Sequence, residues 1–449
     1  MKKIFQYIML AVVTIVMASC TSDIEETTAT TGKNNVQLVV GEFPAFGDSQ
    51  TRAIGTPDEG KTSWAEGDEL LLVIDNTSYG SHSATFTYNG KSWELTSGEL
   101  VYREGDPAYI PHVYYAPNYK LANTSLMLKK GKAAGTDEYI EGKAKITGNG
   151  ETITVSFAET TRKYSRLRIA TLPNEQITVD TEYFTPAGSS DMEQKGNYTL
   201  TSDVKGNAYL YGTFENNSEV TVKYREAALT TYTFSQATEN AKSYALDATV
   251  ISANSAEEIK SAIEQKVADG KTTIRLNLAP NAGTNEFMAI REAIKGAAPN
   301  DLGTIELTII GVETIPEEAF YKMLQLKSVR MSDVKEIKKY AFKECQYLTV
   351  VEAPSLNKLY SGAFKKCDQL SKLTFGPINY ADERNWPIFE YITPNIDLIL
   401  SDYQKEMIET DSYLYTANND RDYAGSDEHN SKNFLGREFK SITCRYPVE

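Results

Sequence analysis

The hydrophobic positions between Val312 and Phe375 recur with a fixed step of 22 residues. The clearest marker is an Ala-Phe pair, which stands at Ala319-Phe320, Ala341-Phe342 and Ala363-Phe364. Further apolar columns keep the same step: Val312, Val334 and Leu356; Ile315, Ile337 and Leu359; Met323, Cys345 and Cys367; Leu326, Leu348 and Leu370; Val329, Val351 and Leu373. A period of about 20 to 29 residues rich in leucine, isoleucine and valine is typical of a leucine-rich solenoid. Such a unit buries its apolar face by stacking on its neighbours.

Each regular unit is expected to contain one strand, with the pattern Leu-x-x-Val/Leu-x-apolar, at residues 326–331, 348–353 and 370–375. Side chains alternate between the two faces of a strand, so every second residue of these segments should point away from the core. The residues predicted on this open face are Ser328, Arg330, Val350, Glu352, Lys372 and Thr374. They form the candidate binding face. The alternative is a solvated face crossed by ion pairs between strands.

Irregular units precede and follow the repeat. Ser255, followed three positions later by Glu258, has the form of a helix-capping box, and Gly270 ends the helix. The other expected elements are a strand at 272–278, a helix at 285–295, and strands at 304–310, 396–400 and 439–446. Residues 252–449 are therefore predicted to form one α/β leucine-rich-repeat domain with caps at its ends.

The first half of the chain has a different pattern, with short alternating strands separated by Gly, Asn and Pro. Strands are expected at 36–40, 69–74, 84–88, 91–95, 108–115, 164–170, 207–214, 220–224 and 242–250. Short strands at such spacing indicate an all-β sandwich. We expect one sandwich over residues 35–158 and a second over 159–251, so the fold class is mixed: a double β-sandwich followed by the repeat domain.

The N-terminus has the pattern of an export signal. Lys2 and Lys3 precede an apolar run at residues 4–17, too short for a stable transmembrane helix. The small residues before Cys20 resemble the lipobox of bacterial lipoproteins, which implies cleavage of a signal at 1–19 and lipid on the Cys20 sulfur. The alternative is an ordinary secretory signal with an incidental cysteine. Residues 20–34 are polar and are expected to be a flexible tether. Asp23, Glu25 and Glu26 follow the cysteine, and in some Gram-negative lipoproteins such a cluster accompanies export to the outer face. The resemblance therefore implies an outer-membrane protein exposed at the cell surface, with the lipid anchor as its only membrane contact.

The order of elements over residues 20–250 resembles the fimbrillin family, the β-sandwich subunits of type V pili and related surface proteins. The matching elements are the lipobox, the first strand with Thr51-Arg52-Ala53, the turn from Trp64 to Gly67-Asp68, Trp93, and Tyr114-Tyr115-Ala116-Pro117. The resemblance implies a transthyretin-like double sandwich.

In that family the first strand can be removed by cleavage after an arginine, which opens a groove for a strand from the next subunit. Arg52 and Ala53 stand at the matching place, so the resemblance implies an accessory or tip subunit of a pilus. The alternative is a surface arginine that is not cleaved. Pilin donor strands come from the C-terminus, and here another domain occupies that end of the chain.

The repeat itself resembles the leucine-rich repeats of BspA-type bacterial surface antigens, whose recurring core is Ala-Phe-x-x-Cys-x-x-Leu. Residues 341–348 and 363–370 match this core throughout, and the first unit differs only in having Met323 for the cysteine. The resemblance implies adhesion to a protein or glycan on a host, on matrix or on another bacterium.

The composition limits the kinds of binding and catalytic site that the chain can carry. A formal net charge of -15 argues against nucleic-acid binding through the whole surface, and 3 His offer little material for histidine catalysis or a metal site. Cys345 and Cys367 occupy one column, so either a disulfide between neighbouring units or two buried thiols is conceivable. Residues 420–425 hint at a calcium loop but lack its later ligands. We therefore expect no catalytic residue, metal or cofactor. A glycan-acting enzyme built on a carboxylate pair stays as a further alternative.

Overall fold

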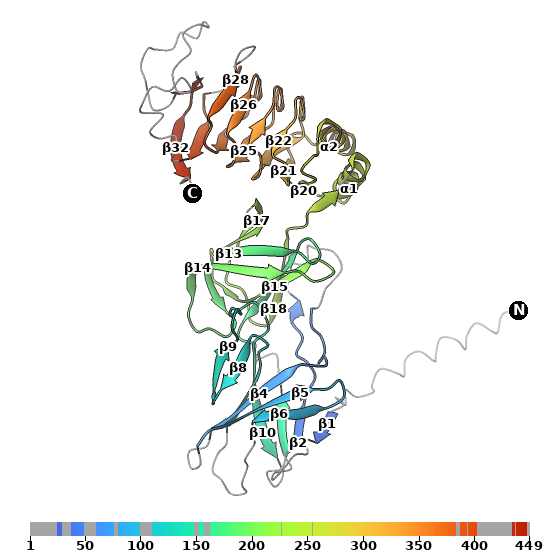
Figure 1. Ribbon diagram of the computed structural model, residues 1–449, viewed down its shortest axis with the longest axis vertical. Helices are drawn as coiled ribbons and strands as arrows, with labels where there is room; N and C mark the ends of the chain where they lie inside the picture. Colours follow the sequence, from blue (N-terminus) through green and yellow to red (C-terminus); the bar gives the residue numbers. More distant parts are fainter. Residues whose placement is uncertain are drawn as a thin grey trace, which may run out of the picture.

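The computed structural model describes residues 25–28, 37–48, 60–75, 80–98, 110–147, 152–156, 162–225, 227–253, 255–382, 387–392, 394–401, 433–435 and 437–446. These residues form three parts that follow one another along the long axis of the molecule (Figure 1). Two are built on β-sheets and the third on parallel ladders of short strands, which lie at the opposite end of the axis from the first sheet.

The first sheet has eight strands. In spatial order they are β1 (Glu25–Thr28), β2 (Gln37–Val40), β11 (Thr152–Ser156), β10 (Ile140–Thr147), β7 (Ile110–Tyr115), β4 (Glu69–Asp75), β5 (His82–Tyr88) and β6 (Trp93–Gly98). All neighbours are antiparallel except β2 and β11, which run parallel. Buried residues from both ends of the order, such as Leu38 and Trp93, share one hydrophobic core, so the sheet curls around it. A hairpin of β8 (Tyr119–Ala122) and β9 (Ser125–Leu128) covers part of its other face.

The second sheet also has eight strands. They are, in spatial order, β17 (Ala227–Thr233), β16 (Glu219–Tyr224), β13 (Gln176–Pro186), β15 (Asn207–Phe214), β12 (Ser165–Ala170), β18 (Lys242–Asp247) and β3 (Gly47–Asp48), with β14 (Glu193–Thr201) paired to β13. Its core is centred on apolar residues such as Leu210, Phe214 and Val220. The mostly β character expected for the first half of the chain is therefore present.

Two segments near the N-terminus differ from the sequence expectation. β3 belongs to the second sheet and not to the first, because it pairs in parallel with β18. β1 falls within the predicted flexible tether and pairs antiparallel with β2, which would otherwise present an open edge. The chain before residue 49 therefore contributes strands to both sheets.

The two sheets meet at a cluster of buried polar and aromatic residues. Arg162 and Glu138 form an ion pair with an N–O distance of 3.3 Å, and their side chains are 0% and 3% exposed. The hydroxyl of Tyr164 donates a hydrogen bond of 2.9 Å to Glu138. The Arg162 guanidinium lies 3.7 Å from the ring centre of Phe46. This cluster joins the segment before β10 to the segment before β12 and fixes the junction between the sheets.

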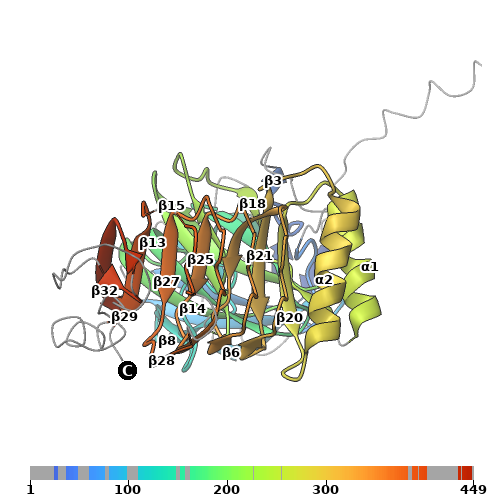
Figure 2. The same cartoon turned by 90° about the horizontal axis from the view of Figure 1, so that it is seen from above.

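The C-terminal part consists of two parallel ladders and two helices. The long ladder contains β19 (Ile251–Ala253), β20 (Thr273–Leu278), β21 (Ile305–Ile310), β23 (Leu326–Arg330), β25 (Val350–Ala353), β27 (Lys372–Phe375), β29 (Asp397–Ser401) and β32 (Ser441–Tyr446). The short ladder contains β22 (Thr314–Ile315), β24 (Glu336–Ile337), β26 (Lys358–Tyr360) and β28 (Tyr380–Asp382). The helices are α1 (Ala256–Ala268) and α2 (Thr284–Ala297), and β30 (Asn433–Phe434) pairs with β31 (Arg437–Glu438). Figure 2 shows the long-ladder strands side by side, with the helices at one end.

The 22-residue period appears directly in the strand register. Ser328 faces Val350, which faces Lys372, and Glu336 faces Lys358, which faces Tyr380. The phenylalanines of the Ala-Phe pairs stack on one another: ring centres of Phe320, Phe342 and Phe364 lie 5.1 and 5.4 Å apart in sequence order. The column of Ala-Phe pairs thus fills the space between the two ladders.

Two strands of the repeat begin later than the pattern predicts. The structure places β25 and β27 at 350 and 372, two residues after the predicted starts. The cause is a turn, because the N–H groups of Leu348 and Leu370 donate to the carbonyls of Cys345 and Cys367 and not across the ladder. The capping box is confirmed in part: the Ser255 side chain accepts a hydrogen bond from the N–H of Glu258.

Candidate functional site

The predicted binding face lies on the outer side of the long ladder, over β23, β25 and β27. The register aligns Ser328, Val350 and Lys372 in one row and Arg330, Glu352 and Thr374 in the next. The apolar partners on the inner side, such as Val329 and Val351, are fully buried. The structure therefore brings all six predicted residues together on one surface.

Ion pairs cross this face. Nε of Arg330 lies 2.8 Å from a carboxylate oxygen of Glu352, and Nζ of Lys372 lies 3.9 Å from its other oxygen. The side chains of Arg330 and Lys372 are 41% and 46% exposed. Exposed pairs of this kind contribute only about 0.2–1 kcal/mol to stability. The solvated face with cross-strand ion pairs, kept above as the alternative, describes these three residues well.

One predicted residue of this face is not exposed. Thr374 is only 3% exposed, so the expectation that it stands open to solvent was wrong. Side-chain direction follows from strand alternation, but exposure also depends on what packs over the strand. The open part of the face is thus formed by Ser328, Arg330, Val350, Glu352 and Lys372.

The second sheet covers the beginning of the same face. Nε of Arg275 in β20 donates a hydrogen bond of 2.6 Å to the carbonyl of Leu229 in β17. Ile310 in β21 packs into the hydrophobic core of the second sheet. Thr308, between them, is 3% exposed. Sequence reasoning missed this contact, because an arginine at a strand position is expected to be solvated.

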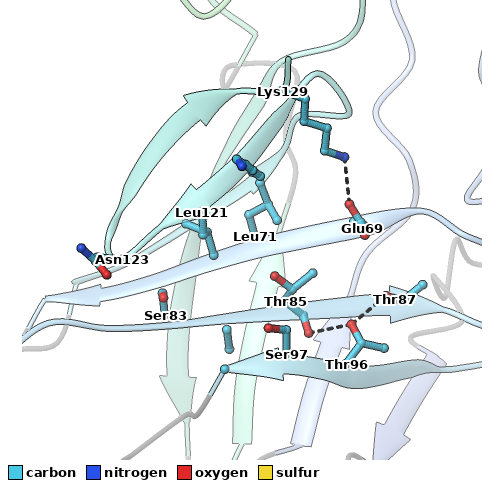
Figure 3. Close-up of a pocket in the computed structure, with 13 residues that line it drawn as sticks. Glu69, Leu71, Ser83, Thr85, Thr87, Thr96, Ser97, Leu121, Asn123 and Lys129 are labelled. Carbon is cyan, nitrogen blue, oxygen red and sulfur yellow. Dashed lines mark hydrogen bonds and ion pairs between the residues drawn. The ribbon is translucent and has the colours of Figure 1, made fainter. Parts of the chain in front are cut away.

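A polar cavity of about 540 Å³ lies on the first sheet, between strands β4 to β6 and the β8–β9 hairpin (Figure 3). Its strand side carries a row of hydroxyls: Ser83, Thr85, Thr87, Thr96 and Ser97. Several of its polar groups already pair with one another. Lys129 lies 3.2 Å from Glu69, and the hydroxyls of Thr87 and Thr96 are 2.8 Å apart. The hydroxyl alternation in β5 was the only sequence signal that could have indicated this cavity.

The two repeat cysteines are buried free thiols and not a disulfide. Each donates a hydrogen bond to a carbonyl of the preceding unit, Cys345 to Phe320 and Cys367 to Phe342. Burial raises the pKa of Cys345 to about 12 and that of Cys367 well above its usual value. Both thiols therefore stay protonated, which suits a packing role and not a reactive one.

Metal-binding groups and membrane-spanning helices were sought among the residues that the structure describes. Among these, no group of three or more His, Cys, Asp or Glu side chains could hold a metal ion. No helix in the described part is long and apolar enough to cross a membrane. Cys20, Arg52 and Ala53 lie outside the described residues, as does the segment 420–425, which lacks the later ligands of a calcium loop.

Comparison with known proteins gives one strong result. A family model described as the BspA type leucine-rich repeat region matches residues 302–408 in six copies. Among solved structures, a candidate cell adhesion protein from Bacteroides fragilis is similar at 10% identity and a TM-score of 0.25, over 51% of this chain and 93% of that protein. GBS52, the minor pilin of Streptococcus agalactiae, is similar at 10% identity and a TM-score of 0.19, over 48% and 95%. No curated protein matches the chain. Structural similarities at these TM-scores support no conclusion about this chain. Residues 302–408, by contrast, are similar to BspA-type repeats.

Proposed function

We propose that this chain is a cell-surface binding protein with a role in adhesion, that its repeat region presents the ligand site, and that it catalyses no reaction. The observation that carries the proposal is the BspA-type match at 302–408, which falls on the two ladders. The partner is a protein or a glycan on a host, on matrix or on another bacterium. Nucleic acid is left out of the proposal, because a formal net charge of -15 argues against binding it through the whole surface.

The proposal includes an anchor at Cys20 in the outer membrane, followed by a short tether. The lipobox pattern before Cys20 carries this part of the proposal. The first sheet begins a few residues after Cys20, and the ladders lie at the far end of the long axis (Figure 1). An anchor at Cys20 would therefore leave the repeat region as the part most distant from the membrane. The first half would act as a fimbrillin-like stalk.

The binding test uses the chain from residue 21 onward on arrays of matrix proteins and glycans. Both sheets are kept, because Arg275 and Ile310 pack on the second sheet and a repeat fragment would expose them. We expect binding to at least one ligand class. Ser328→Arg combined with Lys372→Glu changes both the shape and the charge of the open face, and should weaken binding at least tenfold.

Lys143→Glu is the matched control, because Lys143 is an exposed strand lysine of the first sheet. It should leave binding unchanged. Absence of binding to every matrix protein and glycan on the arrays would refute a binding function. Binding that survives the double substitution would show that the open face is not the contact surface.

A second candidate function is an accessory or tip subunit of a pilus, and the position of β2 favours it. β2 lies next to β11 near one edge of the first sheet, and its Leu38 and Val40 belong to the core. Cleavage after Arg52 would release β1, β2 and β3 together and leave β11 without its parallel neighbour. An unpaired strand with an apolar groove beside it can accept a strand from another chain.

Limited digestion of the folded chain with a trypsin-like protease tests this second function. We expect cleavage after Arg52, followed by capture of a synthetic peptide with alternating apolar residues. Arg52→Gln should prevent both steps. A folded chain that resists cleavage there, or that is cleaved but keeps β2 bound and rejects every added strand, would exclude the pilus role.

A further inference from the structure

The cavity on the first sheet has a floor of hydroxyl groups. Ser83, Thr85 and Thr87 lie on one face of β5 (Figure 3). The residues between them, Ala84 and Phe86, belong to the hydrophobic core on the other face. Successive side chains of a strand point to opposite faces, so a buried core side chain at every second position puts the hydroxyls outside together. β5 pairs with β4 on one side and β6 on the other, so its backbone groups are already used and a ligand would meet its side chains.

A β-bulge in β6 adds a further hydroxyl to this floor. The pairing of β5 with β6 shifts after Thr85, which leaves Thr96 as an extra residue of β6. Its hydroxyl donates a hydrogen bond of 3.2 Å to the carbonyl of Thr85 and lies 2.8 Å from the hydroxyl of Thr87. Bulges are frequent beside active sites, where they redirect a side chain. Here the bulge places two consecutive residues, Thr96 and Ser97, at the cavity.

The β8–β9 hairpin forms the opposite wall of the cavity and is held in place at several points. Leu121 packs on the cluster that contains Leu71 of β4. The N–H of Lys129 donates a hydrogen bond of 2.8 Å to the carbonyl of Asn118 across the base of the hairpin. The ion pair of Lys129 with Glu69 then ties the hairpin to β4. The wall is therefore fixed before a ligand arrives, which reduces the entropy lost on binding.

Five polar side chains of the cavity make no hydrogen bond or ion pair within the described part of the chain. They are the hydroxyls of Ser83, Thr85 and Ser97, the amide of Asn123 and the ammonium group of Lys120. Hydroxyl and amide groups can both donate and accept hydrogen bonds. A few polar groups that converge on one space fix the orientation of a ligand in a binding site. These groups suit a ligand that carries many hydroxyls of its own.

The charge and the walls of the cavity narrow the class of ligand. Glu69 and Lys129 neutralise each other, which leaves Lys120 as the single unpaired cation of the lining. Phosphate sites use several cations or a set of free backbone N–H groups, and β5 offers no such set. The aliphatic side chains of Leu71 and Leu121 also line the cavity. A sugar has both polar hydroxyls and an apolar C–H face, so it matches both kinds of wall.

We propose that this cavity binds a short uncharged glycan, with sugar hydroxyls toward Ser83, Thr85 and Ser97 and a C–H face toward Leu121. The volume of about 540 Å³ lies within the roughly 300–1,000 Å³ of small-molecule sites, which suits about two or three sugars. The site goes beyond the proposed function, because it belongs to the first sheet and shares no residue with the open face of the repeat region. The chain then carries two separate binding sites.

The test is saturation-transfer NMR and titration of the full chain with three uncharged trisaccharides: maltotriose, cellotriose and tri-N-acetylchitotriose. We expect at least one to bind, with little dependence on salt. Ser83→Ala combined with Thr85→Val removes two hydroxyls and keeps a β-branched side chain in the strand, so the thermal midpoint should hold while affinity falls at least tenfold. Ser97→Ala, at an exposed position of β6, is a second variant and should weaken binding in the same direction.

Thr199→Val is the matched control, because Thr199 is an exposed strand threonine of β14 in the second sheet. It should leave affinity unchanged. Failure of all three trisaccharides to bind would overturn the inference, as would unchanged affinity in both cavity variants. Tighter binding of trigalacturonate than of every uncharged trisaccharide would show that charge and not the hydroxyl floor selects the ligand. If trisaccharide binding is lost with Ser328→Arg and Lys372→Glu but survives the cavity variants, the proposed function stands and this inference alone fails.

Discussion

Phe342→Ala is expected to lower the free energy of unfolding of the repeat region by about 3–5 kcal/mol. The Phe342 ring is fully buried and stacks between Phe320 and Phe364. Its plane is tilted by 23° from the first and 7° from the second. Truncation removes the middle ring of a continuous column, so neither neighbour can collapse into the space without breaking its own stack. The cost therefore includes a cavity as well as the lost burial.

Hydrogen exchange read by mass spectrometry suits this test, because the three parts of the chain need not unfold together. Peptides from residues 312–375 should lose protection, while peptides from the first sheet keep theirs. Tyr380→Ala is the control: Tyr380 also belongs to a ladder but is 38% exposed, and its loss should cost less than about 1 kcal/mol. Loss of protection throughout the chain, or a cost below that of Tyr380→Ala, would contradict the role of Phe342.

The repeat could be predicted from the sequence because its contacts are local and periodic. A step of 22 residues sets which residues face one another, so Val329 opposite Val351 and the stack around Phe342 follow directly. Strand alternation then separates inner from outer side chains. The same reasoning does not identify a ligand, because strand alternation gives the direction of a side chain and not the groups that contact it.

The features that the sequence did not indicate all depend on contacts distant in the chain. β3 joins the second sheet through a strand almost 200 residues later, at Lys242–Asp247. Arg275 is buried only because β17 lies against it.

Arg162→Ala is expected to destabilise the junction of the two sheets by about 3–5 kcal/mol. The substitution leaves the Glu138 carboxylate buried, with the Tyr164 hydroxyl as its remaining partner among those described. Burial already raises the pKa of Glu138, and Arg162 opposes that rise. Without Arg162 the carboxyl should bind a proton in the folded state at a pH where the unfolded chain has lost it. Stability of the variant should therefore fall as pH rises above the ordinary glutamate range, and the defect should be larger at about pH 8 than at about pH 5.

The double substitution Arg162→Met with Glu138→Leu distinguishes two effects. One is the destabilisation caused by an unpaired buried carboxylate, and the other is the net contribution of the ion pair to stability. Nε and Nη1 of Arg162 have no hydrogen-bond partner among the described residues, so the buried pair is incompletely satisfied. Two apolar side chains of similar volume, packed against Phe46, should recover most of the lost stability and remove the pH dependence. Chemical denaturation at the two pH values measures both effects. A double variant as unstable as Arg162→Ala would mean that the pair itself, through its hydrogen bonds to the junction, holds the sheets together.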